Sequence, residues 1–394
     1  MTLGSLFTGY GGLDIGCAAA FGDIRTSWVS EVEPGPLKVL THRYPNAAQL
    51  GDITKIDWTT IQPVDVIAGG SPCQDLSLAG KRKGMHEGTR SGLWESMREA
   101  IYTLNPTFVV WENVEGALSA TATSHSQLEC DKGPLGDQST EPANRALGRL
   151  LGDLAEGGYD AFWTTLRASD IGACHHRRRV FVLGVRRDAA DALRGRAGRG
   201  AINPTLAASW GHHVRLADVV EHTLPTPNTM DTLPVRDGEA REKALRRGGE
   251  TSRRRSTGNL REEVVHALPT PDVRSDNRKT KKFGNSGNNF YDIIANRQFG
   301  AYAPAIRRQS QAFGHPAPDP TEPNPRTGKP QLSARFTEWM MGLEPGWITD
   351  VPGITRAEAI RMCGNGVVPQ QATAALIHLI ETADQYLTGA KKAT

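Results

Sequence analysis

Short apolar runs separated by helix-length segments recur along the first half of this chain. Strand-like runs cover residues 2–7, 25–31, 64–68, 107–111 and 179–184, and helical patterns cover residues 13–20 and 36–43. Strands that alternate with helices fold into a mainly parallel sheet with helices on both faces. We therefore predict a doubly wound α/β fold, in which ligands bind at the carboxyl ends of the strands.

The chain of 394 residues is long enough for two or three domains. Residues 119–144 are polar, contain Gly and Pro and lack apolar periodicity, which predicts a surface insertion. Residues 186–330 hold 25 Lys and Arg against 16 Asp and Glu, whereas the remaining residues carry a net negative charge. Helical character returns from Leu332. The expected organisation is an α/β body over 1–185, a basic loop-rich domain over 186–330, and a segment over 331–394 that completes the body.

Composition also limits the class of protein. No apolar run reaches the roughly 18 residues that span a bilayer, and the N-terminus does not resemble a signal peptide, so we expect neither a membrane nor an exported protein. The five cysteines form no C-x-x-C pair, which disfavours a disulfide framework or a zinc ribbon and favours the reducing cytoplasm. No metal is expected, because Cys174, His175 and His176 lack a second pair of ligands.

A glycine-rich turn, Phe7-Thr-Gly-Tyr-Gly-Gly12, follows the first strand and opens a helix. Glycines let backbone approach a ligand closely, and a helix N-terminus offers free N–H groups. Glu31 ends the second strand, where a carboxylate commonly binds ribose hydroxyls, and Asp52 follows near the next strand edge. Ordinary caps and turns explain these residues equally well on this evidence.

Cys73 follows the third strand in the sequence Gly-Gly-Ser-Pro-Cys-Gln. A thiol at a helix N-terminus has a lowered pKa, and Pro72 restricts the backbone that presents it, so Cys73 is a candidate nucleophile. The alternative is a small buried side chain. A glycine-punctuated loop follows and carries Lys81, Arg82, Lys83 and Arg90. It suits either a lid over phosphates or a solvated loop.

Glu112 and Asn113 end the strand at 107–111, at the edge where ligands bind. A carboxyl group between Trp111 and Val114 is a candidate general acid, which Asn113 would orient. Arg177 and Arg179 enter the last strand of the first half. Strand alternation predicts that both point the same way, toward one site.

Taken in chain order, these motifs resemble those of the DNA cytosine-C5 methyltransferases, bacterial and phage modification enzymes that use S-adenosylmethionine. LFTGYGGLDIG resembles the first cofactor motif, GGSPCQDLS the nucleophile motif, WENVEG the E-N-V motif, HHRRRVFVLG the Q-x-R-x-R motif and GNGVVPQQA the final motif. The resemblance covers about residues 2–118, 146–186 and 332–388. It implies a Rossmann-like class I methyltransferase fold, with 186–330 inserted as the target recognition domain that reads DNA.

The resemblance implies a role for each matched residue. Cys73 would attack C6 of a flipped-out cytosine, Glu112 would act at N3 and Arg179 would hold O2, while Arg177, Asn113 and Pro72 would support this geometry. Phe7 would stack on adenine and Glu31 would bind the ribose. The remaining residues expected to bind the cofactor are Gly9, Gly11, Gly12, Leu13, Val32, Asp52, Ile53, Asn365 and Val367.

Double-stranded DNA is the implied substrate, bound by a monomer, and a cognate restriction endonuclease is a possible partner. Base flipping is implied because the reacting base is otherwise stacked inside the duplex. Two departures stand out. His175 occupies the usual Gln position, and Val32 stands where an aromatic residue often packs on adenine.

Three alternatives remain open. A tRNA cytosine methyltransferase shares the motifs but has a small recognition region, whereas about 145 residues lie between the Arg179 strand and Leu332 here. A non-enzymatic DNA-binding protein on a decayed scaffold would not be expected to keep Pro-Cys, Glu-Asn-Val and Arg-x-Arg. A nicotinamide-dependent oxidoreductase would be expected to carry G-x-G-x-x-G, which the first turn lacks.

Overall fold

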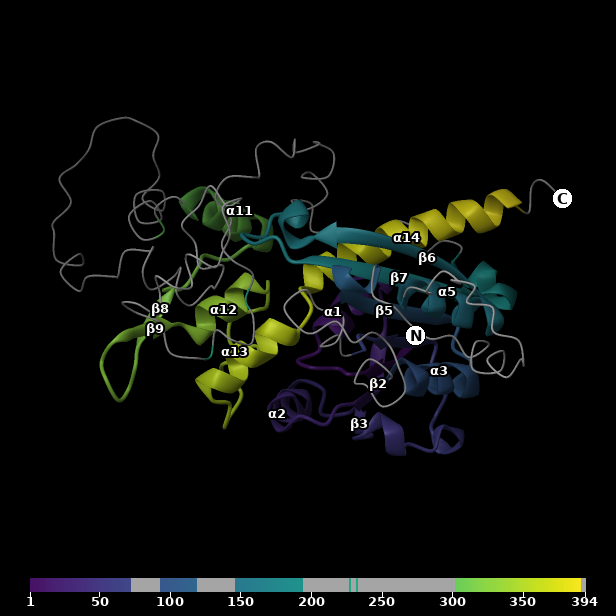
Figure 1. The fold of residues 1–394 in the computed structure, drawn as a ribbon, viewed down its shortest axis with the longest axis horizontal. Helices are drawn as coiled ribbons and strands as arrows, with labels where there is room; N and C mark the ends of the chain where they lie inside the picture. The colour runs from purple at the N-terminus through teal and green to yellow at the C-terminus, as the bar shows by residue number, and fades with distance from the viewer. Residues whose placement is uncertain are drawn as a thin grey trace, which may run out of the picture. The chain divides into compact units, whose positions relative to one another are not determined.

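The structure is a computed structural model that describes residues 1–71, 93–118, 146–193 and 302–390, with the single residues 227, 232 and 299 (Figure 1). The chain divides into two compact units. Unit 1 comprises Met1–Leu166, Arg178–Ile202 and Pro369–Thr394, and unit 2 comprises Arg167–Arg177 and Asn203–Val368. By compactness, residues 167–177 and 331–368 therefore group with unit 2, although the predicted organisation places them in the α/β body and its C-terminal completion.

Unit 1 is built on a seven-stranded sheet with the order β3-β2-β1-β4-β5-β7-β6. β1 pairs in parallel with β2 and β4, β4 pairs in parallel with β5, and β7 runs antiparallel to β5. The strands are β1 Thr2–Leu6, β2 Arg25–Ser30, β3 Ala48–Gln49, β4 Val66–Gly69, β5 Phe108–Val114, β6 Tyr159–Arg167 and β7 Arg178–Arg186.

The five predicted strands are confirmed as β1, β2, β4, β5 and β7, and the predicted α/β fold is confirmed with them. β3 and β6 were not predicted. β3 has only two residues, and β6 lies at the edge of the sheet, where polar side chains weaken the apolar signal. β5 also continues to Val114, so Glu112 and Asn113 lie within the strand and do not follow its end.

Helices cover both faces of this sheet. On β1, the side chain of Ser5 reaches α1 and that of Leu6 joins the core cluster that contains α3, so α1 and α3 lie on opposite faces. α14 packs on α1, where Gly16 allows close approach to Ala372. The helices of unit 1 are α1 Gly12–Phe21, α2 Pro34–Arg43, α3 Leu93–Leu104, α5 Ala146–Glu156 and α14 Pro369–Ala390, with short 3₁₀ turns η1 Ile53–Lys55, η2 Trp58–Thr60, η4 Glu115–Leu118 and η6 Arg187–Leu193.

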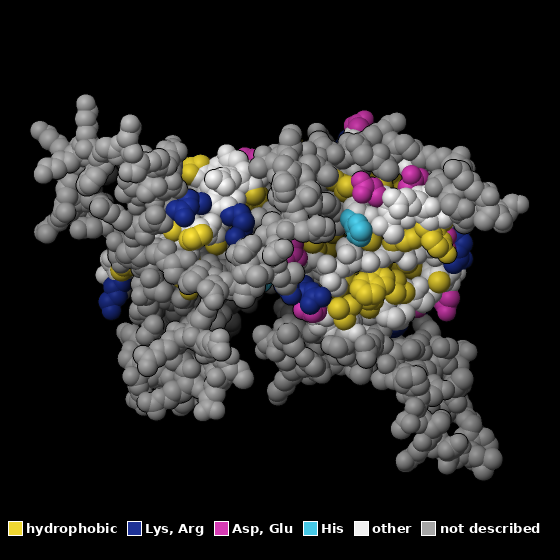
Figure 2. Space-filling view, turned by 90° about the horizontal axis from the view of Figure 1, so that it is seen from above, with side chains coloured by type: hydrophobic (Ala, Val, Ile, Leu, Met, Phe, Trp, Pro, Cys, Tyr) yellow, Lys and Arg dark blue, Asp and Glu magenta, His cyan; other side chains and the backbone are white. Residues whose placement is uncertain are grey.

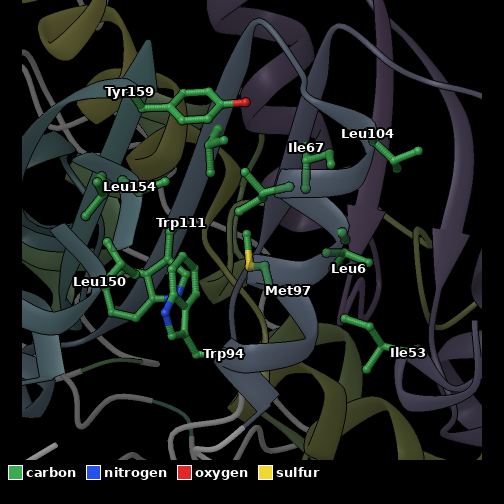
Figure 3. Packing of buried hydrophobic residues seen from close by; sticks show 14 of the residues in the cluster. Leu6, Ile53, Ile67, Trp94, Met97, Leu104, Trp111, Leu150, Leu154 and Tyr159 are labelled. Carbon is green, nitrogen blue, oxygen red and sulfur yellow. The ribbon is translucent and has the colours of Figure 1, made fainter. Parts of the chain in front are cut away.

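The α3 and α5 face is held by a tryptophan-rich core (Figure 3). Trp94 and Met97 of α3 pack with Trp111 of β5 and Leu150 of α5, all fully buried. The indole N–H of Trp94 donates to Asp153 at 2.6 Å, so the start of α3 is tied to α5. The core therefore holds the strand ends that carry the candidate site at fixed positions.

Unit 2 contains η5 Ala168–Ile171, α11 Ala303–Phe313, a hairpin of β8 Thr321–Pro323 and β9 Pro330–Leu332, α12 Ala334–Met340 and α13 Arg356–Asn365. Leu332 thus ends a strand, and helical structure begins two residues later at Ala334. Glu338 of α12 is buried and accepts hydrogen bonds from the backbone N–H groups of Gly346 and Thr349. These bonds hold the turn that follows α12.

Large apolar side chains reach the surface at four positions of the described chain: Val32, Tyr102, Trp163 and Tyr386. Tyr386 of α14 meets Phe162 of the edge strand β6 edge-on, with ring centroids 5.7 Å apart. Figure 2 shows apolar side chains at the surface of the described residues. Within the described ranges, no helix combines the length and the apolar character needed to cross a bilayer.

Candidate active site

The candidate site lies at the carboxyl ends of β1 and β4, where the strand order changes direction. The chain moves outward from β1 to β2 and β3, and then returns to build β4 and β5 on the other side of β1. Ligands of doubly wound sheets bind at such a switch point. Leu6 and Gly69 are paired at the ends of the two strands. The glycine turn and the segment that leads to Cys73 therefore start side by side.

The glycine turn is held in a conformation that few residues adopt. Phe7, Gly9 and Gly11 all have positive φ angles, of 52°, 57° and 84°. Such a value is strained for Phe7 but not for glycine. The backbone N–H of Gly9 donates to the Glu31 carboxylate at 2.9 Å, and the N–H of Gly11 donates to the Thr8 carbonyl at 3.0 Å. The turn opens α1, which starts at Gly12, and Leu13 is buried in the first helical turn.

Glu31 joins the turn after β1 to the start of α2. Its other carboxylate oxygen accepts the N–H groups of Val32 and Glu33 at 2.7 and 2.9 Å. The Val32 side chain beside it is 60% exposed. A Cβ at Gly9 would meet no atom within 4 Å, and the same holds at Gly51. The structure therefore brings Glu31 to the predicted turn and leaves open space beside that turn.

Asp52 and Ile53 have structural partners of their own. Asp52 caps η1, accepting from the backbone N–H and the hydroxyl of Thr54 at 3.1 and 2.8 Å, and these bonds lower the pKa of its carboxyl group. Ile53 is buried in the core cluster. The Ser30 hydroxyl donates to the Gly51 carbonyl at 2.7 Å, which fixes this segment to the end of β2.

The segment that leads to the predicted nucleophile is bound to β5. The Asn113 amide donates to the Ser71 carbonyl at 3.1 Å, and the Trp111 indole donates to the Ser71 hydroxyl at 3.2 Å. A Cβ at Gly70 would lie 3.0 Å from Oε2 of Glu112, so the backbone here runs directly against that carboxylate. Pro72 and Cys73 themselves lie outside the described residues, as do Lys81, Arg82, Lys83 and Arg90.

Glu112 and Arg179 form a buried ion pair. Nε of Arg179 lies 3.0 Å from Oε1 of Glu112, and their side chains are only 14% and 9% exposed. The antiparallel register sets Glu112 opposite Phe181 and Val114 opposite Arg179, so the two charged residues are diagonal neighbours on one face. The predicted acid and the second predicted arginine are thus brought together by the pairing of β5 with β7.

Arg177 belongs to unit 2 and does not extend β7. Its φ angle is +31°, and its guanidinium group donates to the carbonyl oxygens of Gly364 at 3.1 Å and of Gly366. Strand alternation therefore does not describe Arg177, because that residue lies before β7 begins. In unit 2 it caps the end of α13, the segment that carries Asn365 and Val367.

His175, which replaces the expected Gln, is fully buried in unit 2. Its Nε2 lies 2.9 Å from the Met340 carbonyl oxygen, an arrangement that requires the proton on Nε2. Next to it, the backbone N–H of Cys174 donates to the Gln309 side chain at 2.8 Å, and that side chain in turn donates to the Trp339 carbonyl at 2.6 Å. This segment is therefore tied to α11 and α12 by side chains that the sequence alone did not single out.

Sequence reasoning also missed a polar cluster under the glycine turn. Asp14 of α1 is 2% exposed and accepts a hydrogen bond from the Ser5 hydroxyl at 2.8 Å. Burial raises the pKa of its carboxyl group to about 6. The Tyr44 hydroxyl would lie 2.7 Å from a Cβ at Gly11. No local signal marks Asp14, since an acidic residue in a first helical turn is usually a solvated one.

Three comparisons place this chain among known proteins. The sequence model of the family described as C-5 cytosine-specific DNA methylase matches residues 1–381. Type II methyltransferase M.NgoBV of Neisseria gonorrhoeae is 29% identical over 228 residues, and M.NlaIV of Neisseria lactamica is 32% identical over 228 residues. Each alignment covers 57% of this chain and 47% of the relative, so the matched part spans about half of those proteins.

A solved structure extends the comparison to the fold. The S. pombe Dnmt2 methyltransferase superposes with a TM-score of 0.51 at 13% identity, covering 97% of this chain and 99% of the other. This likeness agrees with the seven-stranded sheet and supports the predicted Rossmann-like methyltransferase fold. Because the family model spans nearly the whole sequence, this chain belongs to the C-5 cytosine-specific DNA methylase family.

Proposed function

We propose that this chain transfers a methyl group from S-adenosylmethionine to C5 of a flipped-out cytosine in a specific duplex DNA sequence. The observation that carries the proposal is the buried Glu112–Arg179 pair, set directly against the Gly70 backbone three residues before Cys73. A buried carboxyl group beside a guanidinium group provides one donor or acceptor for N3 and one cation for O2 of a pyrimidine ring. Membership of the family supports the same reaction.

The residues at the switch point fit the cofactor. Open space beside Gly9 and Gly51 admits a ligand next to the turn, and Glu31 retains acceptor capacity for ribose hydroxyls beyond the three N–H groups it binds. Phe7 would contact the adenine, with Val32 in place of the aromatic residue seen in the family. When bound, S-adenosylmethionine supplies an activated methyl group on a sulfonium, so the chain itself needs to supply a nucleophile for the base, to orient the reactants and to move protons.

The remaining chemistry falls to the chain's own residues. The Cys73 thiolate would add to C6 of the cytosine while Glu112 supplies or stabilises a proton at N3, which makes C5 nucleophilic toward the methyl group. Arg179 would hold O2 and keep Glu112 in place. After the methyl group has moved to C5, a base would remove the C5 proton, and elimination would break the bond between sulfur and C6. Sulfur would leave as the Cys73 thiolate, and the proton held at N3 would return to Glu112.

The three thiols that the structure describes are poor nucleophiles, which favours Cys73. Cys17, Cys174 and Cys363 are buried and free, and burial raises the pKa of all three thiols. A nucleophilic thiol requires the opposite shift, toward the thiolate. Cys130, like Cys73, lies outside the described residues, but only Cys73 follows Gly70 and Ser71 at the edge of the sheet.

DNA binding and recognition belong to the same proposal. We assign catalysis to 1–185 with 331–394, and sequence reading to the basic segment 186–330, whose arginines would divide between phosphates and base edges. Lys81, Arg82, Lys83 and Arg90 would contact the DNA backbone. The relatives named type II methyltransferases favour a restriction–modification role with a cognate endonuclease. Action as a monomer in the cytoplasm completes the proposal.

The first experiment is base-resolution sequencing of methylated cytosine in DNA from cells that express the wild type or Cys73→Ser. We expect C5 methylation in one short sequence context in the first case and none in the second. Methylation that persists in the variant would overturn the role of Cys73. If both samples lack methylation although the proteins are folded, the tRNA or decayed-scaffold alternative would replace the proposal, and methyl transfer to tRNA would separate those two.

A further inference from the structure

A buried polar network in unit 1 joins β1, the glycine turn and α1. The Ser5 hydroxyl donates to Asp14 Oδ2 at 2.8 Å, and the Ser5 carbonyl accepts the Thr8 hydroxyl at 3.2 Å. Ser5 and Asp14 thus bracket the turn and close it at its base. Both residues are almost fully buried, so neither contact competes with bulk water.

The carboxylate in this network, that of Asp14, costs free energy to bury. Asp14 is buried, and its second oxygen, Oδ1, has no hydrogen-bond partner among the described residues. Among the described residues, burial raises the pKa of Cys17 in α1 and of Tyr44 directly after α2, and the charge of Asp14 adds to both shifts. Where α14 packs on α1 at Gly16, the atoms nearest to that glycine belong to Pro369, Ala372 and Thr373, all uncharged. A neutral side chain of the same shape would avoid the desolvation of this charge.

We propose that Asp14 is a positioning residue whose ionised carboxylate, acting through the hydrogen bond that it accepts from Ser5, holds the glycine turn in the conformation that binds the cofactor. A hydrogen bond to a charged acceptor is stronger than one to a neutral acceptor, so ionisation tightens the Ser5 contact and with it Thr8. The Tyr44 hydroxyl packs against Gly11 from below, at the point where a Cβ would clash. The inference rests on the proposed function, because it assigns the turn to the cofactor.

The test uses the full chain and measures the affinity for S-adenosylmethionine by calorimetry at pH 8 and pH 5. Asp14→Asn keeps the shape of the side chain and removes its charge. Loss of one charge-assisted hydrogen bond predicts affinity roughly tenfold weaker at pH 8. At pH 5, where the wild-type carboxyl is also neutral, the two affinities should converge. Titration of the ligand itself cancels in this ratio.

The matched control is Asp57→Asn, which removes an exposed carboxylate that caps η2 in the same unit. We expect this variant to bind as the wild type does at both pH values. Thermal unfolding of unliganded Asp14→Asn separates positioning from support of the fold. A merely structural role predicts a lower unfolding midpoint at pH 8, whereas positioning predicts weaker binding with an unchanged or higher midpoint.

The possible outcomes are distinct. If Asp14→Asn binds as tightly as the wild type at pH 8, or if the affinity ratio is the same at both pH values, the inference on Asp14 is wrong and the proposed function stands. If the wild type binds no S-adenosylmethionine, the cofactor assignment itself fails. Should Asp14→Asn not fold, Ser5→Ala carries the test, because it removes only the donor and should weaken binding about fivefold at pH 8.

Discussion

The Glu112–Arg179 ion pair should couple the stability of unit 1 to its proposed active site, and a double-mutant cycle measures that coupling. At the observed 3.0 Å, an effective dielectric constant of about 20 gives an attraction of about 5.5 kcal/mol, which desolvation of the two groups partly offsets. Removing one partner leaves the other charge buried and unpaired. We therefore expect Glu112→Gln and Arg179→Met each to lower the free energy of unfolding by about 3 kcal/mol, with a coupling energy of about 2 kcal/mol.

Urea unfolding of the wild type, both single variants and the double variant gives the coupling energy. Tryptophan fluorescence is a suitable signal, since Trp94 and Trp111 lie in the core beside β5. The pair of Arg178, in β7, with Glu115, in the η4 turn directly after β5, is a control, because its N–O distance is 2.6 Å but its side chains are 39% and 43% exposed. We expect that pair to contribute under 1 kcal/mol and to weaken in 0.5 M salt. A coupling energy for Glu112–Arg179 that is no larger than this control would refute the reasoning.

Three further predictions test other parts of the site and fold. Gly70→Ala places a methyl group 3.0 Å from Oε2 of Glu112, so methyl transfer to DNA should fall at least tenfold while the thermal unfolding midpoint changes by only a few degrees, as scanning calorimetry would show. Burial raises the pKa of Asp14 from 3.8 to about 6. The folded state therefore binds the proton more tightly than the unfolded state, and ionisation of this carboxyl group destabilises the fold. The free energy of unfolding should therefore decline by up to about 3 kcal/mol as pH rises from 4 to 7, a decline that urea titrations should not find in Asp14→Asn. Gly16→Ala brings a Cβ to 2.5 Å from that of Ala372, and separating α1 from α14 should cost about 1–3 kcal/mol by the same measurement.

Two departures from the family pattern have different consequences in this structure. His175 stands where the resemblance leads us to expect Gln, and it makes a buried hydrogen bond through Nε2 to the Met340 carbonyl, which holds the chain before β7. Val32 is mostly exposed, so its small side chain offers little surface for packing on a ligand. We therefore expect Val32 to weaken the affinity for the cofactor, and we expect His175 to leave the geometry of the chain before β7 nearly unchanged.

Residues that belong to the two units are neighbours in sequence at the start of β7. Arg177 caps α13 in unit 2, and only two residues later Arg179 pairs with Glu112 in unit 1. Arg177 holds a left-handed backbone conformation that is unfavourable for a side chain with a Cβ. Strand alternation does not apply across such a residue, so the side-chain direction of Arg177 does not follow from the strand pattern.

Much of this site was accessible from sequence. Apolar runs separated by helix-length segments predicted five of the seven strands, because burial on both faces of a sheet demands them. The glycines after β1 and the Pro-Cys sequence after β4 marked two strand ends, at Leu6 and Gly69, that the sheet then places side by side. The excess of Lys and Arg over Asp and Glu in residues 186–330 could also be counted directly from the sequence.

Other features were decided by tertiary structure alone. The Glu112–Arg179 pair depends on the antiparallel register of β5 and β7, which joins residues 67 positions apart and has no local signal. Asp14 gained its raised pKa only when packing removed water from α1, and Ser5 became its partner only when the strand and helix closed over the turn. Sequence determined which residues were present at each strand end. Packing determined which of them meet, because distance between side chains and exclusion of water are properties of the whole fold.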